Sequence, residues 1–181
     1  MRNNPYQEKI LKTIQRLSRI YSVWNVFVDF VELGALCIAN SCAGKNSPEW
    51  EKREKQYLET LGKYQPEEQK LFPEMFADLV EALQYELTWT NAPTDVLGTL
   101  FHELELHNEY KGQFFTPQHV CDLMGMIALE DGEEAIRKRG FITMSESCCG
   151  SGAMILGFAR AMLEKNLNYC EQLVVVNRPH G

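Results

Sequence analysis

What the chain lacks limits what it can be. Its 181 residues carry 18 Lys and Arg against 25 Asp and Glu, which gives a formal net charge of −7. A chain that binds nucleic acid alone usually presents a basic field, so this balance argues against a self-sufficient DNA- or RNA-binding protein. It is compatible with a basic partner or a separate basic domain.

Metal-binding and disulfide patterns are also lacking. The six cysteines show no C-x-x-C spacing, and several stand in apolar segments, where a free thiol behaves as a small hydrophobe. His102 and His107 are five residues apart, whereas a zinc-binding helix needs two histidines four apart on one face. The sequence therefore predicts no metal site, and it favours a reducing, cytoplasmic compartment.

No segment predicts contact with a membrane. The first residues contain no apolar signal core. The most apolar run, residues 23–39, is interrupted by Asp29 and Glu32 and is shorter than the ~20 residues of a membrane span. We expect this run to be a buried helix.

The first half of the chain has a helical pattern. Apolar residues recur at helical spacing over residues 6–21 and 67–88, and residues 49–61 form a highly charged helical segment. Pro73 is expected to kink or restart the last helix, whose apolar residues Leu71, Met75, Leu79, Val80, Leu83 and Leu87 should face inward. Residues 1–90 are therefore predicted to form an all-helical domain with no catalytic residue.

Two shorter helices are predicted next. Asn91 to Asp95 is a break, and a helix should follow over residues 96–106. Thr116 and Pro117 then predict a helix start, with threonine as the N-cap and proline at the first helical position. The inward face of that helix should consist of Val120, Leu123, Met124, Ile127 and Ala128.

After a charged connector from Asp131 to Gly140, the pattern becomes that of an α/β protein. Residues 141–145 are strand-like, residues 153–163 helical, and residues 173–176 a continuous apolar run typical of a parallel strand buried on both faces. Strand, helix and strand over ~35 residues form one βαβ unit. Residues 91–181 are therefore predicted to be a second, α/β domain in a chain that is mostly helical.

The turn Gly150-Ser151-Gly152 lies between the first strand and its helix, where open α/β sheets bind ligands. The helix amino end offers unpaired N–H groups, and glycine allows a close backbone approach. Glu146 would repel a phosphate but attract an ammonium or sulfonium group. With no G-x-G-x-x-G spacing present, S-adenosylmethionine is favoured over a dinucleotide.

Three segments carry a family resemblance: Asp-Val-Leu-Gly at 95–98, Gly-Gln-Phe-Phe-Thr-Pro at 112–117, and Glu-Ser-Cys-Cys-Gly-Ser-Gly at 146–152. In order and approximate spacing they resemble the adenine-N6 methylase (M) subunits of type I restriction-modification systems. The resemblance implies an N-terminal helical domain followed by the start of a Rossmann-like class I methyltransferase domain. By analogy with the family's motifs X and I, the contacts to S-adenosylmethionine would come from Phe115, Thr116, Glu146, Gly150, Ser151 and Gly152.

The sequence departs from the family in three ways. Motif I usually begins with Asp-Pro-Ala, and here it begins with Glu146-Ser147-Cys148. No acidic residue follows Val176, where the family holds the ribose hydroxyls. The Asn/Asp-Pro-Pro-Tyr/Phe motif, which binds and stacks on the flipped adenine, is missing. The resemblance therefore implies a truncated chain that contains no catalytic residue and is inactive alone.

The expected function is that of the front portion of a DNA adenine-N6 methyltransferase, with DNA bound only in the full-length context. The unfinished sheet should leave strand edges open, which predicts pairing with a restriction-modification subunit or with a second copy of the chain. Two alternatives remain open: a non-catalytic interaction module, or a fragment of an RNA or protein methyltransferase, because those enzymes share the Asn-Pro-Pro-Tyr chemistry.

Overall fold

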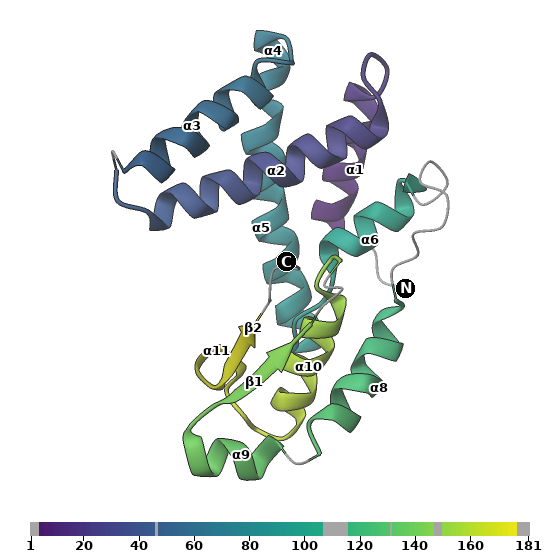
Figure 1. The fold of residues 1–181 in the computed structure, drawn as a ribbon. Coiled ribbons are helices and arrows are strands. Elements are labelled where there is room, and N and C mark those ends of the chain that lie inside the picture. The colour runs from purple at the N-terminus through teal and green to yellow at the C-terminus, as the bar shows by residue number, and fades with distance from the viewer. Residues whose placement is uncertain (1–3, 46, 107–115, 131, 147–149, 177–181) are drawn as a thin grey trace. The chain divides into compact units, whose positions relative to one another are not determined.

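A computed structural model describes residues 4–45, 47–106, 116–130, 132–146 and 150–176 (Figure 1). The chain forms two compact units. Unit 1 comprises Met1–Ala82 and Leu100–Tyr110, and unit 2 comprises Leu83–Thr99 and Lys111–Gly181. The first helices are α1 (Pro5–Leu17), α2 (Val23–Cys42), α3 (Pro48–Leu61), α4 (Pro66–Gln69), α5 (Leu71–Thr90) and α6 (Val96–Glu103).

The remaining elements all belong to unit 2. They are α8 (Gln118–Ala128), α9 (Gly132–Arg139), β1 (Ile142–Ser145), α10 (Ala153–Glu164), α11 (Tyr169–Gln172) and β2 (Leu173–Val176). The fold is mostly helical, as predicted, with a two-stranded parallel sheet among the described residues. The segment expected to be a charged connector contains a helix, α9, with acidic residues in its first turn and basic residues in its last.

Helix α1 begins at Pro5, one residue before the predicted start, and ends at Leu17, four residues before the predicted end at Tyr21. Asn4 is its N-cap and accepts hydrogen bonds from the backbone N–H groups of Tyr6 and Gln7, and Pro5 occupies the first turn. The predicted apolar stripe is buried at Ile10, Ile14 and Leu17. The side-chain amide of Asn4 also donates to the carbonyl of Ala82, which ties the start of α1 to α5.

Helix α2 is held in unit 1 by its two acidic residues. Asp29 is buried and accepts hydrogen bonds from Lys63 Nζ and Tyr64 Oη, each at 2.8 Å. Glu32 accepts from Thr60 Oγ1 at 3.1 Å and from Gln56 Nε2 at 2.6 Å. Within the described residues α2 is the one helix whose length and apolar composition would suit a membrane span. The expectation of a buried helix holds for only part of α2, because its buried residues are Val26, Phe27, Asp29, Phe30 and Leu33, whereas Val28 and Ile38 are exposed.

The helix expected over residues 67–88 is divided in the structure. Helix α4 ends at Gln69 and α5 restarts at Leu71, with Pro73 in its first turn, so the predicted restart is confirmed. Leu71 and Met75 are buried as expected. The prediction that the later apolar residues face inward was wrong, because Val80, Leu83 and Leu87 are exposed.

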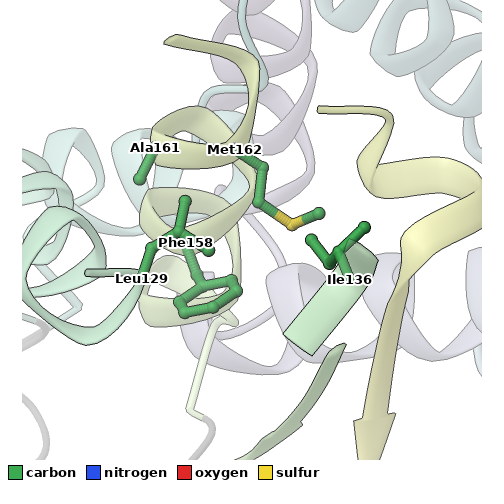
Figure 2. Close-up of a cluster of buried hydrophobic side chains, with 5 residues drawn as sticks. All are labelled: Leu129, Ile136, Phe158, Ala161 and Met162. Atoms are coloured by element: carbon green, nitrogen blue, oxygen red, sulfur yellow. The ribbon is translucent and has the colours of Figure 1, made fainter. Parts of the chain in front are cut away.

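The βαβ unit is confirmed. Strands β1 and β2 pair in parallel, with Ile142 opposite Leu173 and Ser145 opposite Val176, and α10 connects them. The core under the sheet consists of Leu129, Ile136, Phe158, Ala161 and Met162 (Figure 2). Ile142, Met144 and Leu173 pack against this core from the sheet.

The prediction that β2 is buried on both faces was wrong. Val174, Val175 and Val176 are each about 40% exposed. The alternation along β1, with Ile142 and Met144 half-buried and Thr143 and Ser145 exposed, is typical of a sheet with one covered face. A β-branched run predicts a strand, but further layers are needed to cover both of its faces.

Helices α8 and α10 lie side by side and run in the same direction (Figure 1). They approach so closely that a Cβ on Gly125 would lie 2.6 Å from the carbonyl oxygen of Gly157, and a Cβ on Gly157 would meet the carbonyl of Cys121. Asp122 Oδ2 and Arg160 NH1, 2.9 Å apart, form an ion pair across the same contact.

The face of α8 predicted to pack inward is the face that is exposed. Cys121 and Gly125 are buried against α10, whereas Leu123 is 57% and Ile127 64% exposed. Small residues allow the backbones to come together, and this favours the glycine face over the bulkier stripe. The apolar stripe of α8 remains uncovered by the described residues.

Candidate functional site

The candidate site is the turn that joins β1 to α10. Gly150 has φ +51° and Gly152 has φ +85°, in the left-handed region that glycine adopts without strain. No atom lies within 4 Å of where a Cβ on Gly152 would project, so the backbone conformation rather than lack of space requires glycine there. Gly152 is the N-cap residue of α10 and provides no side chain to cap its first N–H groups.

A hydrogen bond fixes this turn to a distant segment. Ser151 Oγ donates to Asp95 Oδ2 at 2.7 Å, across 56 residues of sequence. The other carboxylate oxygen, Asp95 Oδ1, accepts from the backbone N–H of Gly98 at 2.7 Å. Two of the three segments that carry the family resemblance are therefore joined through one side chain.

Asp95 was not among the predicted site residues. A local signal for it exists in the sequence, because an aspartate directly before an apolar helical run is a preferred N-cap. That signal predicts only the bond to Gly98. The bond to Ser151 depends on how the chain folds back, which no local pattern reports.

Thr116 and Pro117 are the described residues of the third segment, and they precede α8. Helix α8 begins at Gln118 with Pro117 as its N-cap residue, one position later than predicted, and Pro117 makes no side-chain capping bond. The Cys121 thiol lies 3.6 Å from the backbone carbonyl of Thr116 and is placed to donate to it. Thr116 itself is exposed at the amino end of α8.

Charges from two of the segments act on the Cys121 thiol of α8. Burial raises the pKa of this thiol, and the negative charges of Asp122, Asp95 and Glu146 raise it further. A thiol with a raised pKa stays protonated and is a poor nucleophile, so Cys121 is a packing residue of this site.

Of the six predicted cofactor residues, Thr116 is exposed before α8, and the other five divide into three groups. Ser151 is bonded to Asp95, and Gly150 and Gly152 flank it with positive φ. Glu146 is half-buried directly after β1. Phe115 lies outside the described residues.

Elsewhere the described residues form a groove but no metal-binding group of side chains. A shallow groove on α3 in unit 1 is formed by one face of a single helix and contains none of the segments that carry the resemblance; its lining residues are Trp50, Glu51, Glu54, Lys55, Leu58 and Glu59. Across the described ranges, no three His, Cys, Asp or Glu side chains are grouped so that they could hold a metal ion. His107 lies outside those ranges.

Comparison of the chain with protein-family models, with curated proteins and with solved structures finds no match. The geometry of unit 2 is therefore what bears on function. It is a βαβ unit in which the glycine turn between β1 and α10 is bonded through Ser151 to the carboxylate of Asp95, with Glu146 directly after β1.

Proposed function

We propose that unit 2 is the S-adenosylmethionine-binding front portion of a DNA adenine-N6 methyltransferase, similar to the M subunits of type I restriction-modification systems. One observation supports the proposal: Asp95, from the segment at 95–98, is bonded to Ser151 in the turn between β1 and α10. The charges of Asp95 and Glu146 also raise the pKa of the Cys121 thiol in α8, the helix that follows Thr116 and Pro117. Nothing in the β1–α10 connection alone requires Asp95 to contact it.

The turn suits a cofactor that carries a carboxylate together with ammonium and sulfonium groups, as S-adenosylmethionine does. The amino end of α10 has a partial positive charge and N–H groups that suit the cofactor's carboxylate. Glu146 offers a negative charge for its ammonium or sulfonium group. Gly152, with open space where a side chain would project, allows the ligand to approach the backbone.

The proposal assigns cofactor binding, and not methyl transfer, to these residues. The 181 residues contain no Asn-Pro-Pro-Tyr or Asn-Pro-Pro-Phe sequence, so the loop that would hold adenine must come from outside them. The net charge of −7 likewise makes DNA contact the role of other segments or subunits. The chain by itself should transfer no methyl group.

A second function, association with another chain, is favoured by apolar surface of unit 2 that the described residues leave uncovered. An exposed stripe on α8 consists of Leu123, Met124 and Ile127. In the described sheet β2 pairs with β1 alone, and its valines are exposed. Such surfaces promote pairing with another chain. A restriction-modification subunit or a second copy of this chain are the proposed partners.

Calorimetric titration with S-adenosylmethionine tests the first function. We expect a dissociation constant in the micromolar range and no comparable heat with NAD or ATP. S-adenosylhomocysteine, which lacks the sulfonium charge, is the matched control ligand. Glu146→Gln should reduce the preference for S-adenosylmethionine over this control, because the carboxylate that attracts the sulfonium is neutralised. No heat at millimolar ligand would favour the association function instead.

A further inference from the structure

We infer that Asp95 is a positioning residue that holds the Gly150-Ser151-Gly152 turn in its ligand-binding conformation. We call the bonds from Gly98 N–H and Ser151 Oγ to its carboxylate the Asp95 latch. The ligand in this inference is the S-adenosylmethionine of the proposed function, on which it depends. The two hydrogen bonds of the latch form within the chain and require no ligand.

Both oxygens of the Asp95 carboxylate accept hydrogen bonds. Oδ1 caps the amino end of α6 by accepting from Gly98 N–H, and Oδ2 accepts from Ser151 Oγ, each at 2.7 Å. The Asp95 backbone carbonyl also accepts from the Thr99 backbone N–H at 3.0 Å and from Thr99 Oγ1 at 2.8 Å. Hydrogen bonds to a charged acceptor are shorter and stronger than neutral ones. The α6 amino end therefore fixes the direction in which Asp95 presents its second oxygen.

Gly98 makes room for this arrangement. A Cβ on Gly98 would lie 2.6 Å from Asp95 Cγ and 2.9 Å from Oδ1, and it would collide with Oδ2. Gly98 has no positive φ that would call for glycine on backbone grounds. Adding a methyl group there should push the carboxylate aside and break the bond to Ser151.

The turn needs such an anchor. Ser151 stands between two glycines, which have the largest conformational freedom of any residue, and it holds the one side chain of the tripeptide. Without the latch, ligand binding would have to order this turn, and the cost of ordering lowers affinity. Losing one hydrogen bond to a charged group should weaken binding about tenfold or more.

The test compares latch variants with a matched capping variant in the same unit. Asp95→Ala, Ser151→Ala and Gly98→Ala each remove the bond between Asp95 and Ser151. The control is Asn168→Ala, which removes the bond from Cys170 N–H to the α11 N-cap, a cap of the same kind away from the turn. Asp95→Asn is the rescue variant, because its amide oxygen still caps Gly98 and its amide N–H can donate to Ser151 Oγ.

Two measurements are made on the whole chain. Amide hydrogen exchange without ligand should speed up about tenfold over residues 150–156 in the three latch variants and stay unchanged there in the control. The S-adenosylmethionine dissociation constant should rise about tenfold in Asp95→Ala and in Ser151→Ala, with no further rise in the double variant. Asp95→Asn should stay within about threefold of the unmodified chain.

The outcomes separate the latch from the proposed function. If the unmodified chain binds no S-adenosylmethionine but the exchange changes appear, the proposed function fails and the latch stands. If the chain binds the cofactor and Asp95→Ala changes neither exchange in the turn nor affinity, the latch is overturned and the cofactor site stands. The latch is also overturned if Asn168→Ala gives the same exchange and affinity changes as Asp95→Ala, because Asp95 would then be only a stabilising cap.

Discussion

In unit 1, helix α2 is bonded through a buried carboxylate to the segment between α3 and α4, whereas the central helices of unit 2 are joined through glycine. In unit 1 the carboxylate of Asp29 is buried and bonded to Lys63 and Tyr64. In unit 2 the backbones of α8 and α10 meet at Gly125 and Gly157 with no room for a methyl group. The first kind of contact is sensitive to charge and pH, and the second is sensitive to volume. The following four changes test this difference, in order of decreasing expected effect.

Gly157→Val should have the largest effect, and it should act on unit 2. A Cβ on Gly157 would meet the backbone of Cys121, which has no flexible end that can move away, so α8 and α10 must separate. Overpacking of this kind costs about 3 kcal/mol. Hydrogen exchange should rise in α8 and α10 and remain unchanged in α2. Gly44→Val is the control, because no atom lies within 4 Å of its Cβ position. An unchanged α10 would show that the close crossing is not essential.

Asp29→Ala should destabilise unit 1 by about 2 kcal/mol, because it leaves the buried Tyr64 hydroxyl without its acceptor. Exchange in α2 and α3 should rise while α10 keeps its protection. The control is Asp78→Ala, which breaks an ion pair with the exposed Lys9 and should cost less than about 1 kcal/mol. Equal losses in the two variants would contradict the importance assigned to the buried anchor.

Unit 1 should lose stability in alkali through Tyr64. Burial raises the pKa of Tyr64 above its ordinary value of 10.0, and the hydrogen bond to the Asp29 carboxylate raises it further. Above pH 10 the unfolded chain loses a proton that the folded chain keeps, so stability falls as pH rises, by at most about 1.4 kcal/mol per pH unit. Denaturant unfolding at pH 9 to 11 measures the slope. Tyr64→Phe should reduce the slope of the unfolding free energy against pH. If the slope is unchanged in this variant, Tyr64 is not the group that causes the loss of stability.

Arg160→Met should have the smallest effect, about 1 kcal/mol, on unit 2. The Arg160–Asp122 ion pair is partly buried, with side-chain exposures of 22% and 15%, but methionine keeps the packing of the aliphatic stem. Thermal unfolding in low and high salt measures its electrostatic part. Lys138→Met is the matched control, since its pair with Glu134 is exposed and should contribute little. A loss as large as that of Gly157→Val would mean that charge, and not glycine, joins α8 to α10.

The sequence by itself determined the elements whose signals are local. The apolar stripe of α1, the restart of the helix near Pro73, and strand β1 with helix α10 all follow from helical periodicity, ring geometry and apolar runs. The βαβ unit also follows, because a strand, a helix and a second strand at this spacing have one favoured arrangement. Glycine at 150 and 152 suits the positive φ that both residues adopt.

Only the tertiary structure decided which surfaces meet. The apolar stripe of α8 pointed to one packing face, but the close approach of Gly125 and Gly157 selected the other. The sequence around Asp95 is typical of a helix N-cap, but the bond from Ser151 to Asp95 joins residues 56 apart in sequence and has no local signal. Periodicity and residue type report how a side chain relates to its own helix or strand. Which distant partner it contacts depends on the shape of both surfaces, and that is settled only when the chain folds.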